Sequence, residues 1–263
     1  HEGRVRPDDL ASAINEKTCL ASIMAANNET GVIQPVSKLA EICRSLNVLF
    51  HTDATQAAGK IPLDVEAMGV DMLTLSGHKL YGPKGAGALY IRKGVELTPL
   101  IHGGSQEHSL RAGTENLTGI TGLGKAAELA VQRLPDMDMV RILRDRLERG
   151  IKEVFPESRL NGHEHERLPN TLNMYLPGFR GESLVMAMDQ KGIAFSSGSA
   201  CRSGSPKPSH ALLAMGLSEE EAHCSVRLSA GIHNTADEID RTVMLFKEVV
   251  QETGSAVRFA PCR

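Results

Sequence analysis

The chain has 263 residues, with 29 basic and 32 acidic side chains interspersed along it, and its net charge at pH 7 is −3. This length is enough to bury a sizeable core, and we expect one large domain followed by a smaller one. The charge argues against a nucleic-acid surface and a polybasic membrane patch. We recognise neither a signal peptide nor an apolar run of the roughly 20 residues that cross a bilayer. We therefore expect a cytoplasmic protein.

Five cysteines are scattered along the chain without a C-x-x-C pair: Cys19, Cys43, Cys201, Cys224 and Cys262. Their odd number and wide spacing predict neither a disulfide scaffold nor a structural zinc site. Cys19 and Cys43 lie within apolar segments, so we expect these two thiols to be buried and unreactive.

The chain begins at His1 rather than at a methionine, and its first residues are typical of a turn that enters a helix in the middle of a domain. We therefore expect an N-terminal portion to lie outside this chain. The first helix is predicted for residues 7–14, because Asp8 and Asp9 occupy the first turn, where the helix dipole favours acidic groups.

Strands and helices then alternate along the first third of the chain. Residues 19–26 form a continuous apolar run, which predicts a parallel strand buried on both faces. A helix over residues 36–46, a strand over residues 48–52 and a central strand over residues 72–76 follow. This alternation is typical of an α/β protein with a right-handed, mostly parallel sheet.

Polar side chains follow the carboxyl ends of three of these strands. They are Asn28, Asp53, Gln56, Ser76, His78 and Lys79. Because the carboxyl ends of adjacent parallel strands meet at one edge of a sheet, where such sheets bind their ligands, we expect these groups to line one crevice.

Lys79 is the residue in this set with the most specific chemistry. A partly desolvated lysine at a strand end loses its proton readily and can form a Schiff base, so Lys79 is a candidate to carry a carbonyl cofactor. The alternative is a solvated loop lysine, because most lysines are exposed.

A second domain is predicted to begin near residue 135, which gives domains over residues 1–134 and 135–263. Between the sheet and this boundary we expect a strand over 87–91, a long polar loop over 101–116, and helices over 117–134 and 137–154. The second domain is expected to contain three strands, of which the first is half-buried: 171–176, 193–196 and 226–229. Two helices are expected over 182–191 and 208–215. A last helix is expected to begin with a Thr235–Glu238 capping box and to end near residue 252.

Cys201 lies in the segment SSGSACRSGS, which is almost entirely serine and glycine. Such a segment gives the backbone freedom, and the neighbouring Arg202 favours the thiolate, so Cys201 is a candidate nucleophile that moves. The alternative is an exposed cysteine without a role. His210, His223 and Cys224 lack the spacing of a metal site, and we predict none.

Four segments taken together, AANNETG, HTDATQAAGK, SGHKLYGPKG and SSGSACRSGSPKPSHAL, resemble the cysteine desulfurases of iron-sulfur cluster assembly. These are pyridoxal 5'-phosphate enzymes of the class-V aminotransferase group, and the resemblance covers essentially the whole chain. It implies the aspartate-aminotransferase fold, fold type I, with the large cofactor-binding domain up to residue 134 and a smaller C-terminal α+β domain that carries a mobile cysteine loop.

The resemblance implies a role for each residue at the strand ends. Lys79 would hold the cofactor as an internal aldimine and move the Cα proton of the substrate, and Asp53 would keep the pyridine nitrogen protonated so that the ring acts as an electron sink. Gln56 would bond the phenolic oxygen of the ring. Ser76 and His78 would donate to the phosphate, and His78 is also counted among the catalytic residues; the alternative for His78 is a purely structural histidine.

Substrate binding and dimerisation follow from the same resemblance. Arg227, with help from Asn28, would bind the carboxylate of L-cysteine, and Asn28 would also contact the cofactor. A buried structural ion pair is the alternative for Arg227. Thr114 would reach the cofactor phosphate of the neighbouring subunit, which implies a homodimer.

The implied reaction transfers sulfur from L-cysteine to Cys201 as a persulfide and releases L-alanine. A sulfur-acceptor protein, such as an iron-sulfur scaffold, would take the persulfide sulfur. The opening third of the family's chain, with its phosphate-binding turn and ring-stacking histidine, is not represented here. A companion N-terminal chain or a proteolytic cut would explain this. The alternatives are a class-V aminotransferase or selenocysteine lyase, or a truncated, non-catalytic relative that binds partners.

Overall fold

The computed structural model describes residues 2–197 and 207–253, and the chain divides into two compact units. The N-terminal unit contains residues 5–25 and 34–134, and the C-terminal unit contains residues 2–4, 26–33 and the described residues from 135 onward. Residues 26–33 group with the C-terminal unit because Val32 forms a bridge with Arg167 and the amide of Ile33 donates to the carbonyl of Glu166. The assignment of the two sequence domains stays a prediction.

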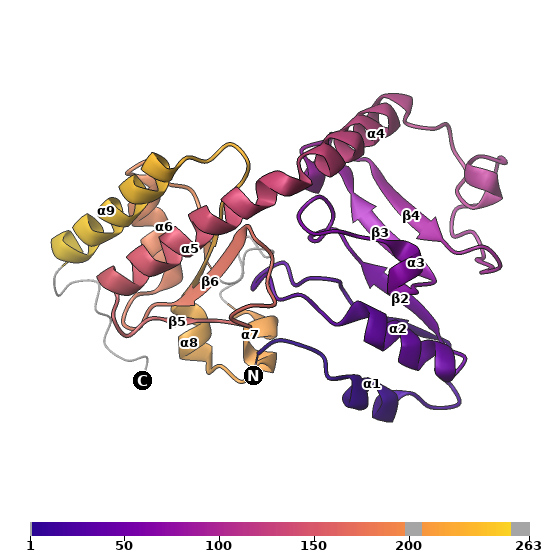
Figure 1. The fold of residues 1–263 in the computed structure, drawn as a ribbon, viewed down its shortest axis with the longest axis horizontal. Coiled ribbons are helices and arrows are strands. Elements are labelled where there is room, and N and C mark those ends of the chain that lie inside the picture. Colours follow the sequence, from indigo (N-terminus) through magenta and orange to yellow (C-terminus); the bar gives the residue numbers. More distant parts are fainter. Residues whose placement is uncertain (1, 198–206, 254–263) are drawn as a thin grey trace. The chain divides into compact units, whose positions relative to one another are not determined.

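The N-terminal unit contains a four-stranded mixed sheet in the order β1-β2-β3-β4 (Figure 1). Its strands are β1 (Leu20–Ser22), β2 (Leu49–Asp53), β3 (Met72–Ser76) and β4 (Gly87–Ile91). β1, β2 and β3 run parallel to one another, whereas β4 is antiparallel to β3. The three parallel strands therefore end at the same edge, as the alternation of elements predicts.

The expectation for the first strand was wrong in two respects. β1 covers three residues rather than eight, and it is an edge strand whose Leu20 is 45% exposed, rather than a strand buried on both faces. Cys19, which directly precedes it, is also exposed, whereas Cys43 is buried as expected. The reason is that β1 pairs with β2 alone among the described residues, so its hydrophobic side chains have no second neighbour to pack against.

Four α-helices belong to the described part of this unit. They are α1 (Pro7–Ala13), α2 (Val36–Ser45), α3 (Val65–Met68) and α4 (Leu117–Gln132), with short 3₁₀ turns η1 (Gly77–Leu80) and η2 (Glu107–Ser109). α1 packs against α2, and α4 packs against η1. Buried Ala58, Leu80, Leu123 and Ala126 form the small hydrophobic cluster between α4 and η1, which fixes the turn that follows β3.

The C-terminal unit contains a second four-stranded sheet, which is entirely antiparallel and has the order β5-β6-β8-β7. Its strands are β5 (Arg159–Leu160), β6 (Thr171–Tyr175), β7 (Ser196–Ser197) and β8 (Ser225–Ser229). The expectation of a half-buried strand at β6 was wrong, because four of its five residues are buried. Leu172 and Met174 pack in the main core, and Asn173 on the other face donates to the carbonyl of Glu29 at 3.0 Å.

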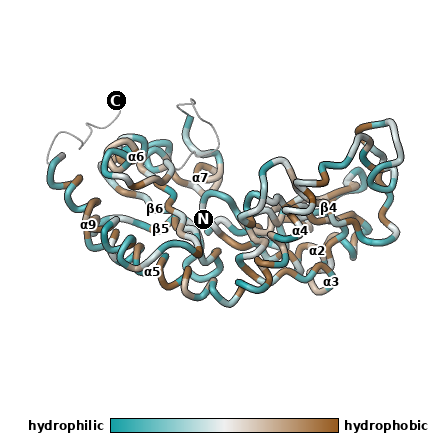
Figure 2. The backbone as a smooth tube through the Cα atoms, turned by 90° about the horizontal axis from the view of Figure 1, so that it is seen from above, coloured by the Kyte–Doolittle hydropathy of each residue, from teal (hydrophilic) through white to brown (hydrophobic). Residues whose placement is uncertain are grey.

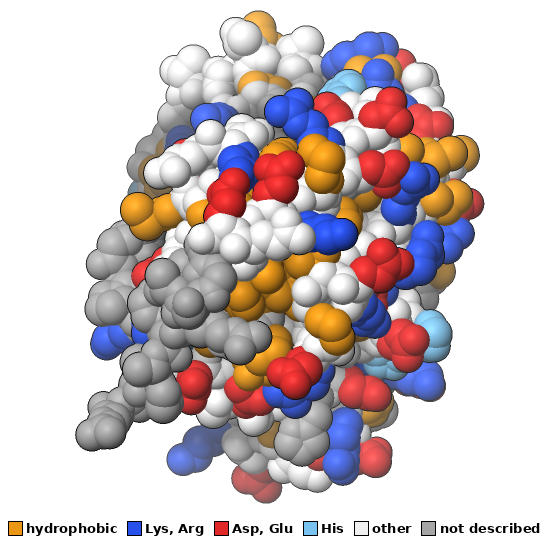
Figure 3. Space-filling model, turned by 90° about the vertical axis from the view of Figure 1, so that its left-hand side faces the viewer, with side chains coloured by type: hydrophobic (Ala, Val, Ile, Leu, Met, Phe, Trp, Pro, Cys, Tyr) orange, Lys and Arg blue, Asp and Glu red, His pale blue; other side chains and the backbone are white. Residues whose placement is uncertain are grey.

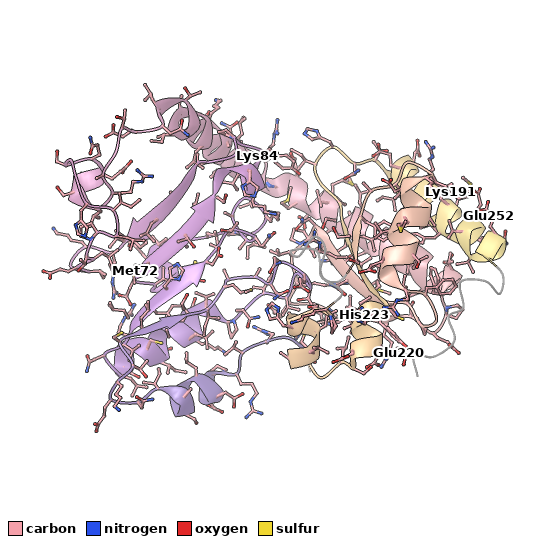
Figure 4. All side chains as sticks on the ribbon, turned by 180° about the vertical axis from the view of Figure 1, so that it is seen from behind. Met72, Lys84, Lys191, Glu220, His223 and Glu252 are labelled. Carbon is pink, nitrogen blue, oxygen red and sulfur yellow. The ribbon has the colours of Figure 1, made fainter. Side chains whose placement is uncertain are left out.

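Three helices supply the rest of this core, namely α5 (Met137–Val154), α6 (Gly181–Asp189) and α9 (Ala236–Thr253). A short 3₁₀ turn, η3 (Leu134–Asp136), leads into α5. In Figure 2 hydrophobic and hydrophilic segments alternate along α5 and α9, which is typical of helices with one apolar face. That face meets β6 and β8 in a cluster that includes Phe155, Phe179 and Phe246. Lys191 after α6 donates to Glu252 of α9 at 3.0 Å, and the two side chains lie next to each other in Figure 4.

The remaining helices are α7 (His210–Ala214) and α8 (Glu219–His223). α8 was not predicted, although Ser218 and Glu221 form a capping box at its start. The capping box predicted for the last helix is confirmed, since the Thr235 amide donates to Glu238 at 2.9 Å and the Glu238 amide donates to the Thr235 hydroxyl at 3.3 Å.

Basic and acidic side chains are interspersed on the face shown in Figure 3. Among the described residues, no helix has both the length and the apolar character that a membrane span requires.

Candidate functional site

A tight turn at the end of β3 carries three of the predicted site residues. β3 ends at Ser76, and η1 then presents His78 and Lys79, both of which are exposed. The amide of Gly82 donates to the carbonyl of Gly77 at 2.9 Å and closes the turn. A Cβ atom at Gly82 would lie 2.9 Å from the Cβ of Ala126 on α4, so only glycine allows the turn to pack this closely against the helix.

Ser76 and His78 form a hydrogen-bonded pair on this turn. The hydroxyl oxygen of Ser76 lies 2.8 Å from Nδ1 of His78. The bond orients both side chains and leaves the far ring nitrogen of His78 available to another group. A hydroxyl and an imidazole held together at a strand end are well suited to bind an anion.

Asp53 lies at the end of the neighbouring parallel strand. In the register of β2 and β3, Asp53 is opposite Thr74, two residues before Ser76. Its carboxylate is exposed, and Oδ1 accepts a hydrogen bond from the amide of Thr55 at 2.8 Å. Half-buried Gln56 lies in the turn that follows β2. The N-terminal unit therefore contains an amine, a carboxylate, an amide and the Ser76–His78 pair at the ends of two adjacent strands.

Two further groups near these strands were missed by the sequence analysis. Nζ of Lys60 lies 3.4 Å from the backbone carbonyl oxygen of Lys79. Burial lowers the pKa of Lys60 to about 8, and the positive charge of Lys79 adds to this effect. The only signal for Lys60 in the sequence is its position at the end of the motif HTDATQAAGK.

His51 is the second of these groups, two residues before Asp53 on β2. Nδ1 of His51 lies 2.7 Å from the hydroxyl oxygen of Ser22 on β1. Burial lowers the pKa of His51, while the negative charge of Asp53 acts in the opposite direction. His51 and Asp53 share one face of the strand, because side chains two residues apart in a strand point the same way.

Arg227 and Asn28 come together in the C-terminal unit. Nη1 of Arg227 on β8 donates to the backbone carbonyl of Asn28 at 2.9 Å, and Nη2 donates to the hydroxyl of Ser196 at 3.3 Å. Nε of Arg227 is buried and has no hydrogen-bond partner among the described residues. Both acceptors are neutral, so neither of them balances the charge of the guanidinium, which suits a carboxylate ligand.

The other predicted residues have different surroundings. Thr114 is exposed in the loop before α4, two residues before Asn116, whose side chain caps that helix. Cys201 lies outside the described residues. No group of three or more His, Cys, Asp or Glu side chains among the described residues could hold a metal ion.

Comparisons with known proteins give one consistent family. The family described as Aminotransferase class-V matches residues 1–242. Cysteine desulfurase IscS of Methanosarcina thermophila is 49% identical over 251 residues, which are 95% of this chain and 62% of that protein.

Solved structures agree with this result. A NifS-like protein superposes with a TM-score of 0.88 at 38% identity, over 95% of this chain and 66% of that chain. The structure of SspA in complex with cysteine superposes with a TM-score of 0.71 at 35% identity, over 89% of this chain and 65% of that one. The chain thus spans slightly less than two thirds of the length of each of these three relatives.

Proposed function

The chain belongs to the class-V aminotransferase family, and from this premise we propose that it is part of a pyridoxal-phosphate-dependent cysteine desulfurase. The activity would transfer sulfur from L-cysteine to Cys201 and release L-alanine. The observation that carries the proposal is the placement of Lys79 on the turn after β3, beside the strand that ends in Asp53.

The residues of the N-terminal unit fit this cofactor chemically. An exposed lysine amine can bind its aldehyde, and an exposed carboxylate can pair with its ring nitrogen. The Ser76–His78 pair can bind its phosphate, and the Gln56 amide can bond its phenolic oxygen. When bound, pyridoxal phosphate supplies an electron sink for the carbanion at the substrate Cα.

Lys79 has two tasks in this proposal. Its amine would hold the cofactor, and the same amine would take the Cα proton of the substrate as a general base. Asp53 keeps a proton on the ring nitrogen, because a carboxylate stabilises the positive charge there. The exposure of both side chains makes them accessible to ligands.

Arg227 and Asn28 would bind the substrate. The guanidinium of Arg227 is held by two neutral oxygens and can pair with the carboxylate of cysteine in a bidentate manner. The relative SspA has been solved in complex with cysteine, which supports an amino acid of this size as the substrate.

Cys201 would act as the sulfur acceptor. Its thiolate forms an S–S bond to the substrate sulfur while the Cβ–S bond of the substrate breaks, and the electron pair of that bond remains on Cβ, which is protonated to give alanine. Arg202 follows Cys201 in the sequence and favours the thiolate.

The partners form the last part of the proposal. Thr114 would contact the cofactor phosphate bound by a second copy of the chain, which requires a homodimer. An iron-sulfur scaffold or a similar acceptor in the cytoplasm would take the persulfide sulfur. The part of the relatives' length that this chain does not span would complete the cofactor site.

Absorbance and product analysis of the holoenzyme test this proposal. L-cysteine should change the cofactor spectrum and yield equal amounts of sulfide and alanine in the presence of a thiol reductant. Cys201→Ser should keep the cofactor colour and lose sulfide release, whereas the matched variant Cys19→Ser, at an exposed cysteine, should retain it.

Two results would contradict the proposal. Turnover that survives in Cys201→Ser, with amino-group transfer to a 2-oxo acid, would indicate an aminotransferase. A colourless protein in which borohydride fixes no cofactor on Lys79 would indicate a non-catalytic relative.

A further inference from the structure

We propose that Lys60 is a positioning residue for Lys79: its ammonium group holds the backbone of the turn from which the Lys79 side chain projects. This inference rests on the proposed attachment of the cofactor to Lys79. It adds a second lysine to the site, one that acts on Lys79 rather than on the cofactor.

The contact is between the Lys60 side chain and the Lys79 backbone. Nζ of Lys60 donates to the carbonyl oxygen of Lys79 over 3.4 Å. Within η1 the carbonyl of Gly77 accepts from the amides of Tyr81 and Gly82. Lys60 therefore supplies a donor to a carbonyl at the end of the turn, where a short helix leaves its last carbonyl groups without partners from the helix itself.

The backbone before Lys60 is fitted closely to the same turn. Gly59 has a φ of +70°, and a Cβ atom there would lie 2.8 Å from Cδ2 of Leu80 and 3.0 Å from Cβ of Ala130. Leu80 is the residue after Lys79, and it is buried against α4. Glycine at position 59 thus lets the backbone approach Leu80 and brings Lys60 beside the carbonyl of Lys79.

The electrostatic surroundings of Lys60 are unfavourable for a purely structural residue. Burial lowers its pKa to about 8, and the positive charge of Lys79 acts in the same direction. No carboxylate among the described residues offsets these two effects in its pKa. The half-buried ammonium of Lys60 has no carboxylate partner in its pKa within this part of the chain, which costs folding free energy, and such groups concentrate at functional sites.

The benefit would come from the direction of the Lys79 side chain. When the backbone of the turn is fixed, the Lys79 amine samples fewer orientations. Its attachment to a bound aldehyde then costs less conformational entropy. Losing a hydrogen bond from a charged donor typically changes an equilibrium by about tenfold or more.

Reconstitution of the apo form of the holoenzyme with pyridoxal phosphate tests this inference. Lys60→Met removes the charge and the donor but keeps an unbranched side chain, and it should weaken covalent attachment of the cofactor by about tenfold. Lys60→Arg keeps both properties and should restore most of the attachment. Lys38→Met, at an exposed lysine on α2, is the matched control and should behave like the wild type.

Two readouts separate positioning from folding. The cofactor spectrum gives the rate and extent of attachment, and thermal unfolding of the apoprotein gives its stability. We expect Lys60→Met to lose attachment without losing stability, because an apolar group replaces a half-buried charge whose pKa shows no carboxylate partner in the part of the chain that the structure describes. If Lys60→Met does not fold, Lys60→Ala supplies the same measurement, since it also removes the charge and the donor, and we expect a loss in the same direction.

Normal attachment in Lys60→Met, or a loss that follows a fall in stability, would overturn the inference and leave the proposed function intact. A wild-type protein that attaches no cofactor would overturn the proposed function, and this inference with it.

Discussion

Nη1 of Arg227 donates to the backbone carbonyl of Asn28 at 2.9 Å, across a separation of 199 positions in the sequence. The bond ties the middle of β8 to the polar segment that follows β1. It also orients a guanidinium group whose second donor, Nη2, holds the hydroxyl of Ser196 at the end of the described residues before Cys201. In the proposed function, the carboxylate of the substrate would therefore bind next to Ser196, five positions before Cys201 in the sequence.

The first prediction concerns Arg227→Lys. Lysine keeps the charge but lacks the planar fork that pairs with a carboxylate through two parallel hydrogen bonds, so KM for L-cysteine should rise by about 100-fold while kcat changes less. Steady-state sulfide production measures both constants. Arg149→Lys, at an exposed arginine on α5, is the control, and an unchanged KM in Arg227→Lys would show that the carboxylate binds elsewhere.

The second prediction concerns the Ser76–His78 pair. Ser76→Ala removes one partner of the 2.8 Å bond and one donor for a phosphate, so the dissociation constant of pyridoxal phosphate should increase by about 10-fold to 100-fold. Titration of the apoprotein followed by absorbance measures this constant. Ser37→Ala, at an exposed serine on α2, should bind the cofactor like the wild type. Equal affinities in both variants would remove Ser76 from the phosphate site.

Local signals in the sequence predicted the elements that carry this site. The apolar run from Met72 to Leu75 and the glycine at position 77 predicted β3 and its end correctly, because a buried strand and a tight turn each depend on a few neighbouring residues. The capping box at Thr235 is a similar case. The box formed by Ser218 and Glu221 was visible in the same way and would have predicted α8.

Features that depend on distant neighbours were not predictable by this route. The exposure of β1 depends on which strands flank it. The burial of β6 depends on the core that covers Leu172 and Met174 on one face and, on the other, on distant residues such as Glu29, which is 144 positions from Asn173. Lys60 was missed because its partner is a backbone carbonyl, and a carbonyl leaves no pattern in the sequence. The roles of Arg227 and Thr114 came from the family resemblance and not from the local pattern.

The third prediction compares two glycines with left-handed backbones in the same unit. Gly59 has a φ of +70° and no room for a Cβ atom, whereas Gly85 has a φ of +77° and nothing within 4 Å of that position. Gly85→Ala should therefore cost only the backbone strain, about 1 kcal/mol, and Gly59→Ala should cost about 3 kcal/mol because it also forces Leu80 or Ala130 to move. Urea unfolding of both variants measures the difference. Equal losses of unfolding free energy in the two variants would mean that the side chains around η1 can move to accommodate a Cβ atom at little cost.

The fourth prediction uses Glu148, a buried carboxylate on α5. Oε2 of Glu148 accepts a hydrogen bond from Arg167 at 2.5 Å, and Oε1 accepts one from Lys152 at 2.7 Å. Burial alone would raise the pKa of Glu148, but the bonds and charges of Lys152 and Arg167 together outweigh it and lower the pKa below its ordinary value of 4.5. The charged form is therefore favoured in the folded protein.

Because its pKa is lower in the folded than in the unfolded chain, Glu148 stabilises the fold above pH 4.5 and loses this effect as the pH falls through the folded pKa. Glu148→Gln removes the nearer counter-charge of buried Arg167 and leaves only Asp145, whose Oδ1 lies 3.7 Å from Nη2, so the variant should lower the free energy of unfolding at neutral pH by about 3 kcal/mol. The difference from the wild type should shrink in acid, where the wild-type carboxyl is also uncharged. Urea unfolding at neutral and acidic pH, with Glu153→Gln at an exposed site of the same helix as control, measures this dependence, and a difference that stays constant with pH would contradict it.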